Sequence, residues 1–374
     1  MQNGIPSDGD GPILLLIDDF GQGGAQRQLA MIAREFVARG REVVVVRYAE
    51  RDFLEPEIRV SGAQVVRLEG SGRIGWIRSV GRLVRRIKPS VACVFLKGPA
   101  SLALISNRLG SWGCPIVVCE READADRSIG LKLRITLALY RGASAIVCNS
   151  IRQTEWFVRN QPALADRTEY IGNAVDLERF SFSEPRSGIP SDLLVLGRVA
   201  ELKGVCLLAQ ALELIPETSP AAKAIRVHWY GHHHHQGDAL VESAGGSDRT
   251  ISFAPPVSDV PELMHRFDAV VLPSLSEATP NVVLEAMASG RVVIATDVGD
   301  SARLVEDGVT GWIVPPSDPQ ALADALVSLN STPIGRLHEM ALAGRRRMEE
   351  LVSIDRIVDQ YEEVFVRIGS KSWE

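Results

Sequence analysis

The chain has 374 residues, of which 45% are hydrophobic, and a formal net charge of −6. This length exceeds one typical domain and allows two cores of ordinary size. No apolar run reaches the roughly 18 residues of a membrane span, and residues 1–11 are polar and glycine-rich. We therefore expect neither a membrane helix nor a signal peptide, and a cytoplasmic protein.

Apolar runs alternate with helical patterns along the first half of the chain. Strands are predicted at 12–17, 42–47, 91–96, 116–119 and 145–148, and a helix at 25–39 that ends at Gly40. This alternation favours a parallel sheet with right-handed crossovers.

Glycines follow the first predicted strand. Gly23 and Gly24 come after a Gly21-Gln22 turn and before a helix, so the backbone there can approach a ligand closely. A glycine-rich turn is also common without any ligand, and the residues alone leave both interpretations open.

The segment between Glu69 and Glu120 contains no acidic residue. Apolar residues recur at helical spacing over 74–87, and Arg78, Arg82 and Arg85 form a basic stripe on the same predicted helix. Such a helix could lie on an anionic membrane surface. It could equally be a surface helix that packs its apolar face on the sheet.

A second series of strands begins after residues 182–190, a stretch rich in Ser, Pro and Gly. Strands are predicted at 193–196, 225–230, 251–253, 269–272, 292–296 and 312–314, followed by a final helix at about 353–368. We therefore predict an α/β protein with two doubly wound domains, 1–182 and 183–352, followed by residues 353–374.

Two cations follow the first strand of the second series. Arg198 and Lys203 lie between that strand and a helix that begins near Val205. A guanidinium and an ammonium that converge on one point suit a diphosphate leaving group, whose negative charge grows as it departs. By spacing alone they could also be two solvated surface cations.

The segment 277–290 places two carboxylates, Glu277 and Glu285, around a turn that opens into a helix. Backbone N–H groups at a helix N-terminus are unpaired and carry the positive end of the helix dipole. We expect four residues of this turn to form a seat for phosphate or sugar oxygens: Thr279, Pro280, Asn281 and Val282. Glu277 could also be only a charge partner of the helix N-terminus.

The stretch from Glu277 to Glu285 closely resembles the Glu-x7-Glu signature of the family-four retaining glycosyltransferases of GT-B fold, the glycosyl transferases group 1. Other segments match the same family in the same order: 23–29, 171–180, 196–204, 297–300 and 306–314. The resemblance implies two Rossmann-like doubly wound domains that face each other across a cleft, with a C-terminal helix that crosses back to the first domain. The first domain would face the acceptor, and the second would bind the nucleotide-sugar donor.

The resemblance also implies roles for the candidate residues. Arg198 and Lys203 would be the leaving-group pair, Glu285 would accept hydrogen bonds from the ribose hydroxyls, and Glu277 would face the donor sugar. Gly23 and Gly24 would belong to the donor-binding residues, across the cleft from the diphosphate and near the acceptor. Retention needs no protein nucleophile, because the departing phosphate can take the acceptor's proton on the same face.

The chain departs from the family pattern at several places. No histidine precedes residue 228, so the donor-contacting histidine that many relatives have in the first domain is missing. The corresponding strand end carries Glu120 and Arg121, which could contact the donor sugar or acceptor, or form an exposed ion pair. Ala278 and Asp300 replace glycines. The run His232–His235 is not expected to bind a metal, because adjacent side chains point in different directions.

We therefore expect a metal-independent retaining glycosyltransferase without a cofactor, with a glycan or lipid-linked acceptor and no nucleic-acid partner. A UDP-sugar is the first expectation for the donor and GDP-mannose the second. The alternatives are a nucleotide-sugar 2-epimerase of the same architecture and a glycosyltransferase-like binding subunit without turnover.

Overall fold

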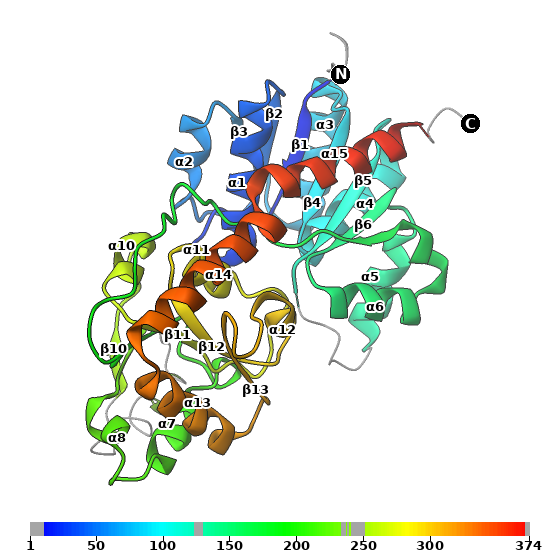
Figure 1. Cartoon of the computed structure of the whole chain (residues 1–374). Coiled ribbons are helices and arrows are strands. Elements are labelled where there is room, and N and C mark those ends of the chain that lie inside the picture. Colours follow the sequence, from blue (N-terminus) through cyan, green and yellow to red (C-terminus); the bar gives the residue numbers. More distant parts are fainter. Residues whose placement is uncertain (1–10, 123–129, 233–236, 238, 241–250, 371–374) are drawn as a thin grey trace. The chain divides into compact units, whose positions relative to one another are not determined.

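The computed structural model describes residues 11–122, 130–232, 237, 239–240 and 251–370 (Figure 1). The chain forms two compact units. Unit 1 comprises Met1–Ala174 and Ile354–Glu374, and unit 2 comprises Val175–Ser353.

Unit 1 is built on a seven-stranded sheet of order β3-β2-β1-β4-β5-β6-β7, in which every pairing is parallel. The strands are β1 (Ile13–Leu16), β2 (Val43–Arg47), β3 (Gln64–Arg67), β4 (Val91–Phe95), β5 (Ile116–Glu120), β6 (Ala145–Cys148) and β7 (Thr168–Tyr170). The helices are α1 (Gly24–Ala38), α2 (Glu55–Val60), α3 (Gly72–Ile87), α4 (Lys97–Gly110), α5 (Leu131–Tyr140), α6 (Ile151–Asn160), the 3-10 helix η1 (Pro162–Arg167) and α15 (Ile354–Ser370).

Alternate residues of the strands supply two separate cores, one on each face of the sheet. Ile13 and Leu15 of β1 pack under α1, α2 and α15, whereas Leu14 and Leu16 pack under α3, α4, α5 and α6. Strands that are buried on both faces read as continuous apolar runs. This explains why the sequence predicted β1, β2 and β4 so directly.

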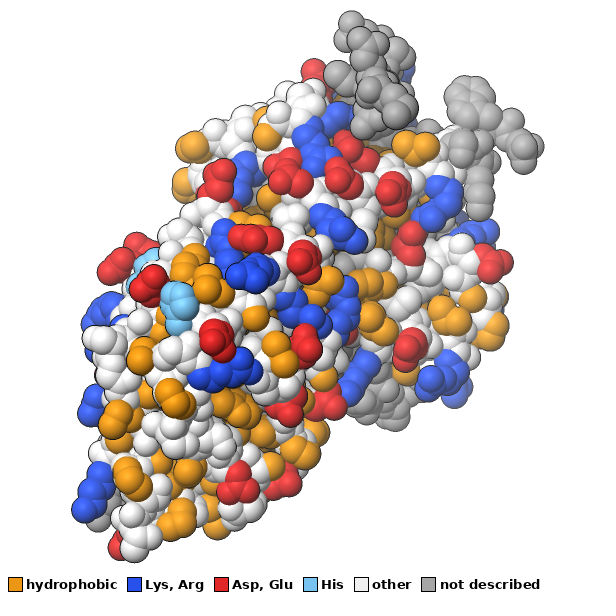
Figure 2. Space-filling view, viewed as in Figure 1, with side chains coloured by type: hydrophobic (Ala, Val, Ile, Leu, Met, Phe, Trp, Pro, Cys, Tyr) orange, Lys and Arg blue, Asp and Glu red, His pale blue; other side chains and the backbone are white. Residues whose placement is uncertain are grey.

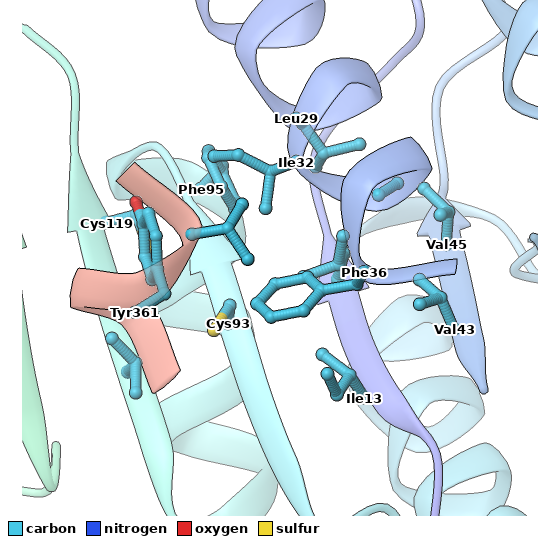
Figure 3. Packing of buried hydrophobic residues seen from close by; sticks show 14 of the residues in the cluster. Ile13, Leu29, Ile32, Phe36, Val43, Val45, Cys93, Phe95, Cys119 and Tyr361 are labelled. Carbon is cyan, nitrogen blue, oxygen red and sulfur yellow. The ribbon is translucent and has the colours of Figure 1, made fainter. Parts of the chain in front are cut away.

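The C-terminal helix α15 completes the first of these cores. Tyr361 is 1% exposed, and the ring of Phe365 stacks on Phe36 of α1 at 5.7 Å between centroids. Figure 3 shows Phe36 and Tyr361 over the strands that carry Cys93 and Cys119. In the face seen in Figure 2, acidic and basic side chains are interspersed over this helix.

The chain leaves unit 1 between Ala174 and Val175, earlier than the boundary expected at 182–183. Val175 N donates to Val352 O, and Phe180 is buried in a core of unit 2. The Ser/Pro/Gly-rich stretch at 182–190 therefore lies inside unit 2, ahead of its first strand.

Unit 2 is built on a six-stranded sheet of order β10-β9-β8-β11-β12-β13, again with parallel pairings only. The strands are β8 (Asp192–Leu196), β9 (Arg226–Tyr230), β10 (Ile251–Ala254), β11 (Ala269–Leu272), β12 (Val292–Thr296) and β13 (Gly311–Val314). The helices include the 3-10 helix η2 (Glu201–Lys203), α7 (Val205–Leu214), α8 (Pro220–Ala224), α10 (Val260–His265), α11 (Asn281–Ala288), α12 (Ser301–Leu304), α13 (Pro319–Ser331) and α14 (Ile334–Val352). The predicted pair of doubly wound parallel sheets is thereby confirmed.

In both units the order of the strands reverses once. The reversal lies between β1 and β4 in unit 1 and between β8 and β11 in unit 2. Open α/β sheets bind their ligands outside the carboxyl ends of the strands at such a switch point. Among the described helices, none combines the length and the apolar character that crossing a membrane requires.

Candidate active site

The switch point of unit 2 brings Lys203 and Glu277 together. Lys203 ends η2 just after β8, and Glu277 lies in the loop between β11 and α11. Lys203 Nζ donates to Glu277 Oε1 at 2.5 Å, and Ser274 Oγ donates to the same oxygen at 2.8 Å. The side chains of Lys203 and Glu277 are 29% and 14% exposed, so a ligand can still reach the pair.

Glycine at position 204 allows this approach. Gly204 has φ +77°, and a Cβ there would lie 1.8 Å from Pro273 O. The amide of Leu275 also donates to Leu202 O at 2.8 Å. The loop after β8 and the loop after β11 are thus in direct contact, and this contact sets the distance between Lys203 and Glu277.

Arg198 lies in the same loop after β8. It is exposed, and no hydrogen bond or ion pair engages its guanidinium within the described part of the chain. The preceding Gly197 has φ +147°, and its carbonyl accepts a bond from Trp229 Nε1 at 2.8 Å. The backbone of the turn is therefore held by β9, while the Arg198 side chain remains available to an anion.

The turn ahead of α11 is braced by the segment after β12. Thr279, which is 7% exposed, donates from Oγ1 to Asp300 Oδ2 at 3.2 Å, and Asp300 N donates to Ala278 O at 2.9 Å. Gly299 has φ +55°, and a Cβ there would lie 2.0 Å from Ala278 O. Asp300, noted in the sequence as a departure from glycine, therefore has a positioning contact with Thr279.

Helix α11 begins at Asn281, with Pro280 as its N-cap and no side-chain cap. The backbone N–H groups of Asn281 and Val282 stand at this N-terminus, where the helix dipole favours a negative charge. Glu285 lies one turn further on and is 8% exposed. The predicted seat residues and both carboxylates thus occupy one loop and the first turns of one helix.

In unit 1, the predicted glycines begin α1. Gly23 is its N-cap and Gly24 its first residue. A Cβ at Gly23 would lie 2.2 Å from Gln26 Oε1, and Gln26 Nε2 donates to Asp18 and Asp19 at 3.4 and 3.3 Å. The two carboxylates after β1 were missed by the sequence analysis, although their position directly after a buried strand could have indicated them.

Glu120 is buried, which excludes the exposed ion pair considered from the sequence. Its exposed fraction is 0%, Tyr140 Oη donates to Oε1, and Lys97 Nζ lies 3.6 Å from Oε2. Lys97 and Tyr140 were not singled out in the sequence. A carboxylate so enclosed holds β5, α4 and α5 together at the carboxyl edge of the sheet.

Arg121 points toward the C-terminal helix. Its Nη1 donates to Asn173 Oδ1 at 2.8 Å, its Nη2 donates to Tyr361 Oη, and its guanidinium lies 5.1 Å from the centre of the Phe95 ring. Arg121 therefore joins three segments of unit 1 that are far apart in sequence. Glu120 and Arg121 belong to unit 1, whereas Lys203 and Glu277 belong to unit 2.

Over the described ranges, no three or more His, Cys, Asp or Glu side chains gather into a group that could hold a metal ion. His232 is exposed, and Val199 N donates to its carbonyl. The remaining histidines of the run, 233–235, lie outside the described residues.

Comparison with known families gives a family match for each half of the chain. Residues 190–331 match the family described as "Glycosyl transferases group 1", and residues 22–179 match "Glycosyltransferase Family 4". A phosphatidyl-myo-inositol mannosyltransferase from Mycobacterium leprae is 28% identical over 93% of this chain and 95% of its own length. A D-inositol 3-phosphate glycosyltransferase from an Arthrobacter strain is 32% identical, and this alignment spans 60% of the chain and 58% of that relative.

Solved structures share the fold. The Anabaena protein HepE in complex with UDP-glucose superposes with a TM-score of 0.81 at 20% identity, over 96% of this chain and 100% of HepE. Sucrose-phosphate synthase from Thermosynechococcus elongatus has a TM-score of 0.77 at 18% identity, over 96% and 100% of the two chains. With two Rossmann-like units and family matches on each, the chain belongs to the family-four glycosyltransferases of GT-B fold, the glycosyl transferases group 1.

Proposed function

We propose that this enzyme is a metal-independent, retaining glycosyltransferase that uses a nucleotide-diphosphate sugar. The observation that carries the proposal is the group formed by Lys203, Glu277 and Ser274 at the switch point of unit 2, with Arg198 in the same loop after β8 as Lys203. The loop that carries Glu277 leads into the N-terminus of α11, which has no side-chain cap. This combination suits a diphosphate that acquires negative charge as the sugar leaves.

The contacts suggest a separate role for each of the two cations, Lys203 and Arg198. Lys203 is held by Glu277 at 2.5 Å, so the ammonium is already positioned when a phosphate arrives. Arg198 has no competing partner among the described residues and can provide the second cation. With both cations in place, the protein itself supplies the charge stabilisation that a metal ion gives in other transferases.

Glu277 is better suited to hold the sugar than to attack it. One of its oxygens already accepts bonds from Lys203 and Ser274, which lowers the nucleophilicity of the carboxylate while leaving acceptor capacity for sugar hydroxyls. In the proposed reaction the bond from the anomeric carbon to the phosphate oxygen breaks. The departing phosphate takes the acceptor's proton, and the new bond forms on the same face.

For the donor we propose a UDP-sugar first and a GDP-sugar such as GDP-mannose second. The Anabaena structure was solved with UDP-glucose, and the Mycobacterium relative is named for mannosyl transfer. Glu285, on the first turns of α11, would accept hydrogen bonds from the ribose hydroxyls with either donor. Relatives named for phosphatidyl-myo-inositol and inositol 3-phosphate support a polyol, glycan or lipid-linked acceptor.

We propose in addition that the enzyme works peripherally on the cytoplasmic face of an anionic membrane through α3. Arg78, Arg82 and Arg85 are exposed on this helix, and within the described residues none forms an ion pair. Val80 and Val84 are buried against the sheet, so the contact would be made by the cations and not by insertion of the apolar face. Each basic residue near an anionic surface contributes about 1 kcal/mol.

The central experiment measures release of UDP from UDP-glucose and of GDP from GDP-mannose by the purified protein without acceptor. Slow release that depends on Arg198 and Lys203 is expected of a transferase, whereas a 2-epimerase would invert the configuration at C2 of the sugar. A binding subunit would show thermal stabilisation by the nucleotide sugar and no release. Absence of both binding and release with every nucleotide sugar would refute the proposal.

The membrane proposal is tested by sedimentation with vesicles of phosphatidylcholine and phosphatidylglycerol at low salt. The parent should bind, and a variant with Arg78, Arg82 and Arg85 replaced by Gln should bind far less. Gln in place of Arg134, Arg152 and Arg159, three exposed arginines on α5 and α6, provides a control with the same change in charge. If the parent protein stays in the supernatant, the membrane proposal is wrong and these arginines are only solvated surface residues.

A further inference from the structure

The carboxylate of Glu277 is held in place by neighbours on both of its sides. Its Oε1 atom accepts hydrogen bonds from Lys203 Nζ at 2.5 Å and from Ser274 Oγ at 2.8 Å. Ser274 is 0% exposed, and its carbonyl accepts a bond from Thr296 Oγ1 at 2.5 Å. The carboxylate is therefore attached to β12 through Ser274, and it cannot turn away from the ammonium without breaking a buried contact.

This attachment places a negative charge beside the phosphate site of the proposed function. A phosphate oxygen bound to Lys203 Nζ would lie about 2.8 Å from the nitrogen, and so no more than about 5.3 Å from Glu277 Oε1. An ammonium has three donors, so Lys203 can bind the phosphate while it stays paired with Glu277. Because the two side chains are only 29% and 14% exposed, water screens the repulsion between phosphate and carboxylate incompletely.

The charges around Glu277 in unit 2 do not favour a highly charged ligand. The loops after β8, β11 and β12 and the helices α11 and α12 carry more carboxylates than cations: Glu201, Glu277, Glu285, Asp297 and Asp300 against Arg198, Lys203 and Arg303. An additional negative charge on a ligand is therefore not matched by an additional cation in these segments.

The product of the proposed reaction carries more charge than the donor. When the bond from the anomeric carbon to the phosphate oxygen breaks, this oxygen keeps the electron pair and takes the proton of the acceptor. Above about pH 6 a terminal phosphate loses that proton to water. At neutral pH the β-phosphate of free UDP therefore carries about two negative charges, whereas the β-phosphate of a UDP-sugar carries about one.

We propose that Glu277 promotes release of the product, because its fixed carboxylate repels the free nucleoside diphosphate more strongly than the donor. This inference rests on the proposed transfer reaction and adds the release step to it. Glu277 still faces the donor sugar as long as the sugar is in place. Product release limits the turnover of many enzymes, so a charge that weakens product binding raises the rate of the whole cycle.

The test measures the affinities of UDP and of its β-methyl ester by calorimetry at about pH 7.5, where the terminal phosphate of UDP is ionised. The ester has the charge of the donor and no sugar, so a sugar contact of Glu277 influences neither measurement. Glu277→Gln keeps the shape of the side chain and removes its charge, and it should tighten UDP about fivefold more than the ester. Glu213→Gln, the same change at an exposed carboxylate on α7, should alter neither affinity. GDP and its ester replace the uridine ligands if the protein binds GDP instead.

A second measurement removes the charge from the ligand. At about pH 5 the terminal phosphate of UDP keeps its second proton, so UDP and the ester have nearly the same charge. The preference of Glu277→Gln for UDP, relative to the parent, should then fall below about twofold. Histidines also titrate in this range, but the parent and the variant have the same histidines, so their contribution cancels.

An equal change in the affinities of UDP and the ester, or a preference for UDP that persists at low pH, would overturn the role in product release and leave the donor site intact. If the parent binds none of the four ligands, the proposed donor site is wrong, and the role of Glu277 falls with it. If Glu277→Gln does not fold, Ser274→Ala decides, because it keeps both charges and frees the carboxylate. UDP should then tighten about twofold relative to the ester, and an unchanged ratio would overturn the role.

Discussion

Replacing Lys203 with Ala tests the leaving-group assignment most directly. The ammonium lies 2.5 Å from Glu277 in the free protein. During the reaction it would stabilise the negative charge of the departing phosphate. Removing one preorganised donor from an oxyanion site costs about 2.7–4 kcal/mol in the barrier. At about 1.4 kcal/mol for each tenfold change in rate, turnover should fall roughly 100- to 1,000-fold.

The effect on stability should be much smaller. Lys203 is 29% exposed, so water can solvate Glu277 when its partner is removed. A pair of this exposure contributes about 0.2–1 kcal/mol to the free energy of unfolding. The variant should therefore remain folded at assay temperature, and the loss of turnover should not be a loss of native protein.

The assay compares kcat for nucleotide release in the parent, Lys203→Ala, Lys203→Arg and the exposed-lysine control Lys223→Ala, with urea unfolding of each. Lys203→Arg should keep part of the activity, because a cation remains near Glu277. Lys223 lies on α8, outside the switch-point loops, and its replacement should leave kcat unchanged. A Lys203→Ala variant with parental kcat, or one whose activity loss matches its loss of folded protein, would refute the assignment.

Three further results are expected. Glu285→Ala should weaken UDP affinity, because two hydrogen bonds to a charged group, each worth about 1.5–3 kcal/mol, are lost; unchanged affinity for every nucleotide by calorimetry would remove the ribose role. EDTA should leave turnover unchanged, and strict dependence on added Mg²⁺ or Mn²⁺ would contradict the division of charge proposed for Arg198 and Lys203. Gly204→Ala should destabilise unit 2 by more than about 2 kcal/mol in urea unfolding, because φ +77° and the 1.8 Å approach to Pro273 O exclude a Cβ; a parental midpoint would show that the two loops can separate.

The sequence predicted the strands that are buried on both faces and missed the strands at the edges of unit 1. β3 and β7 are short, and their residues are half-buried or exposed, so neither presents a continuous apolar run. Their pairing depends on β2 and β6 already being in place. Edge strands of this kind are determined by tertiary context more than by local pattern.

The sequence located the candidate residues on loops of the fold but did not predict their contacts. Lys203 and Glu277 are far apart in sequence, but both follow parallel strands, whose carboxyl ends lie at one edge of the sheet. Their mutual contact was not foreseen, since it depends on how Gly204 packs against Pro273. The burial of Glu120 was also missed, because its partners Lys97 and Tyr140 come from other crossovers.

The return of α15 to unit 1 has a consequence for biosynthesis. Tyr361 and Phe365 emerge from the ribosome after all of unit 2, yet they fill the same core as Phe36. Domains generally fold in the order in which they are synthesised. Here the first unit to be made cannot complete its core until α15 is translated, so unit 2 can fold while one face of the sheet of unit 1 is still partly uncovered. A premature stop after residue 353 would therefore damage the unit that was synthesised first.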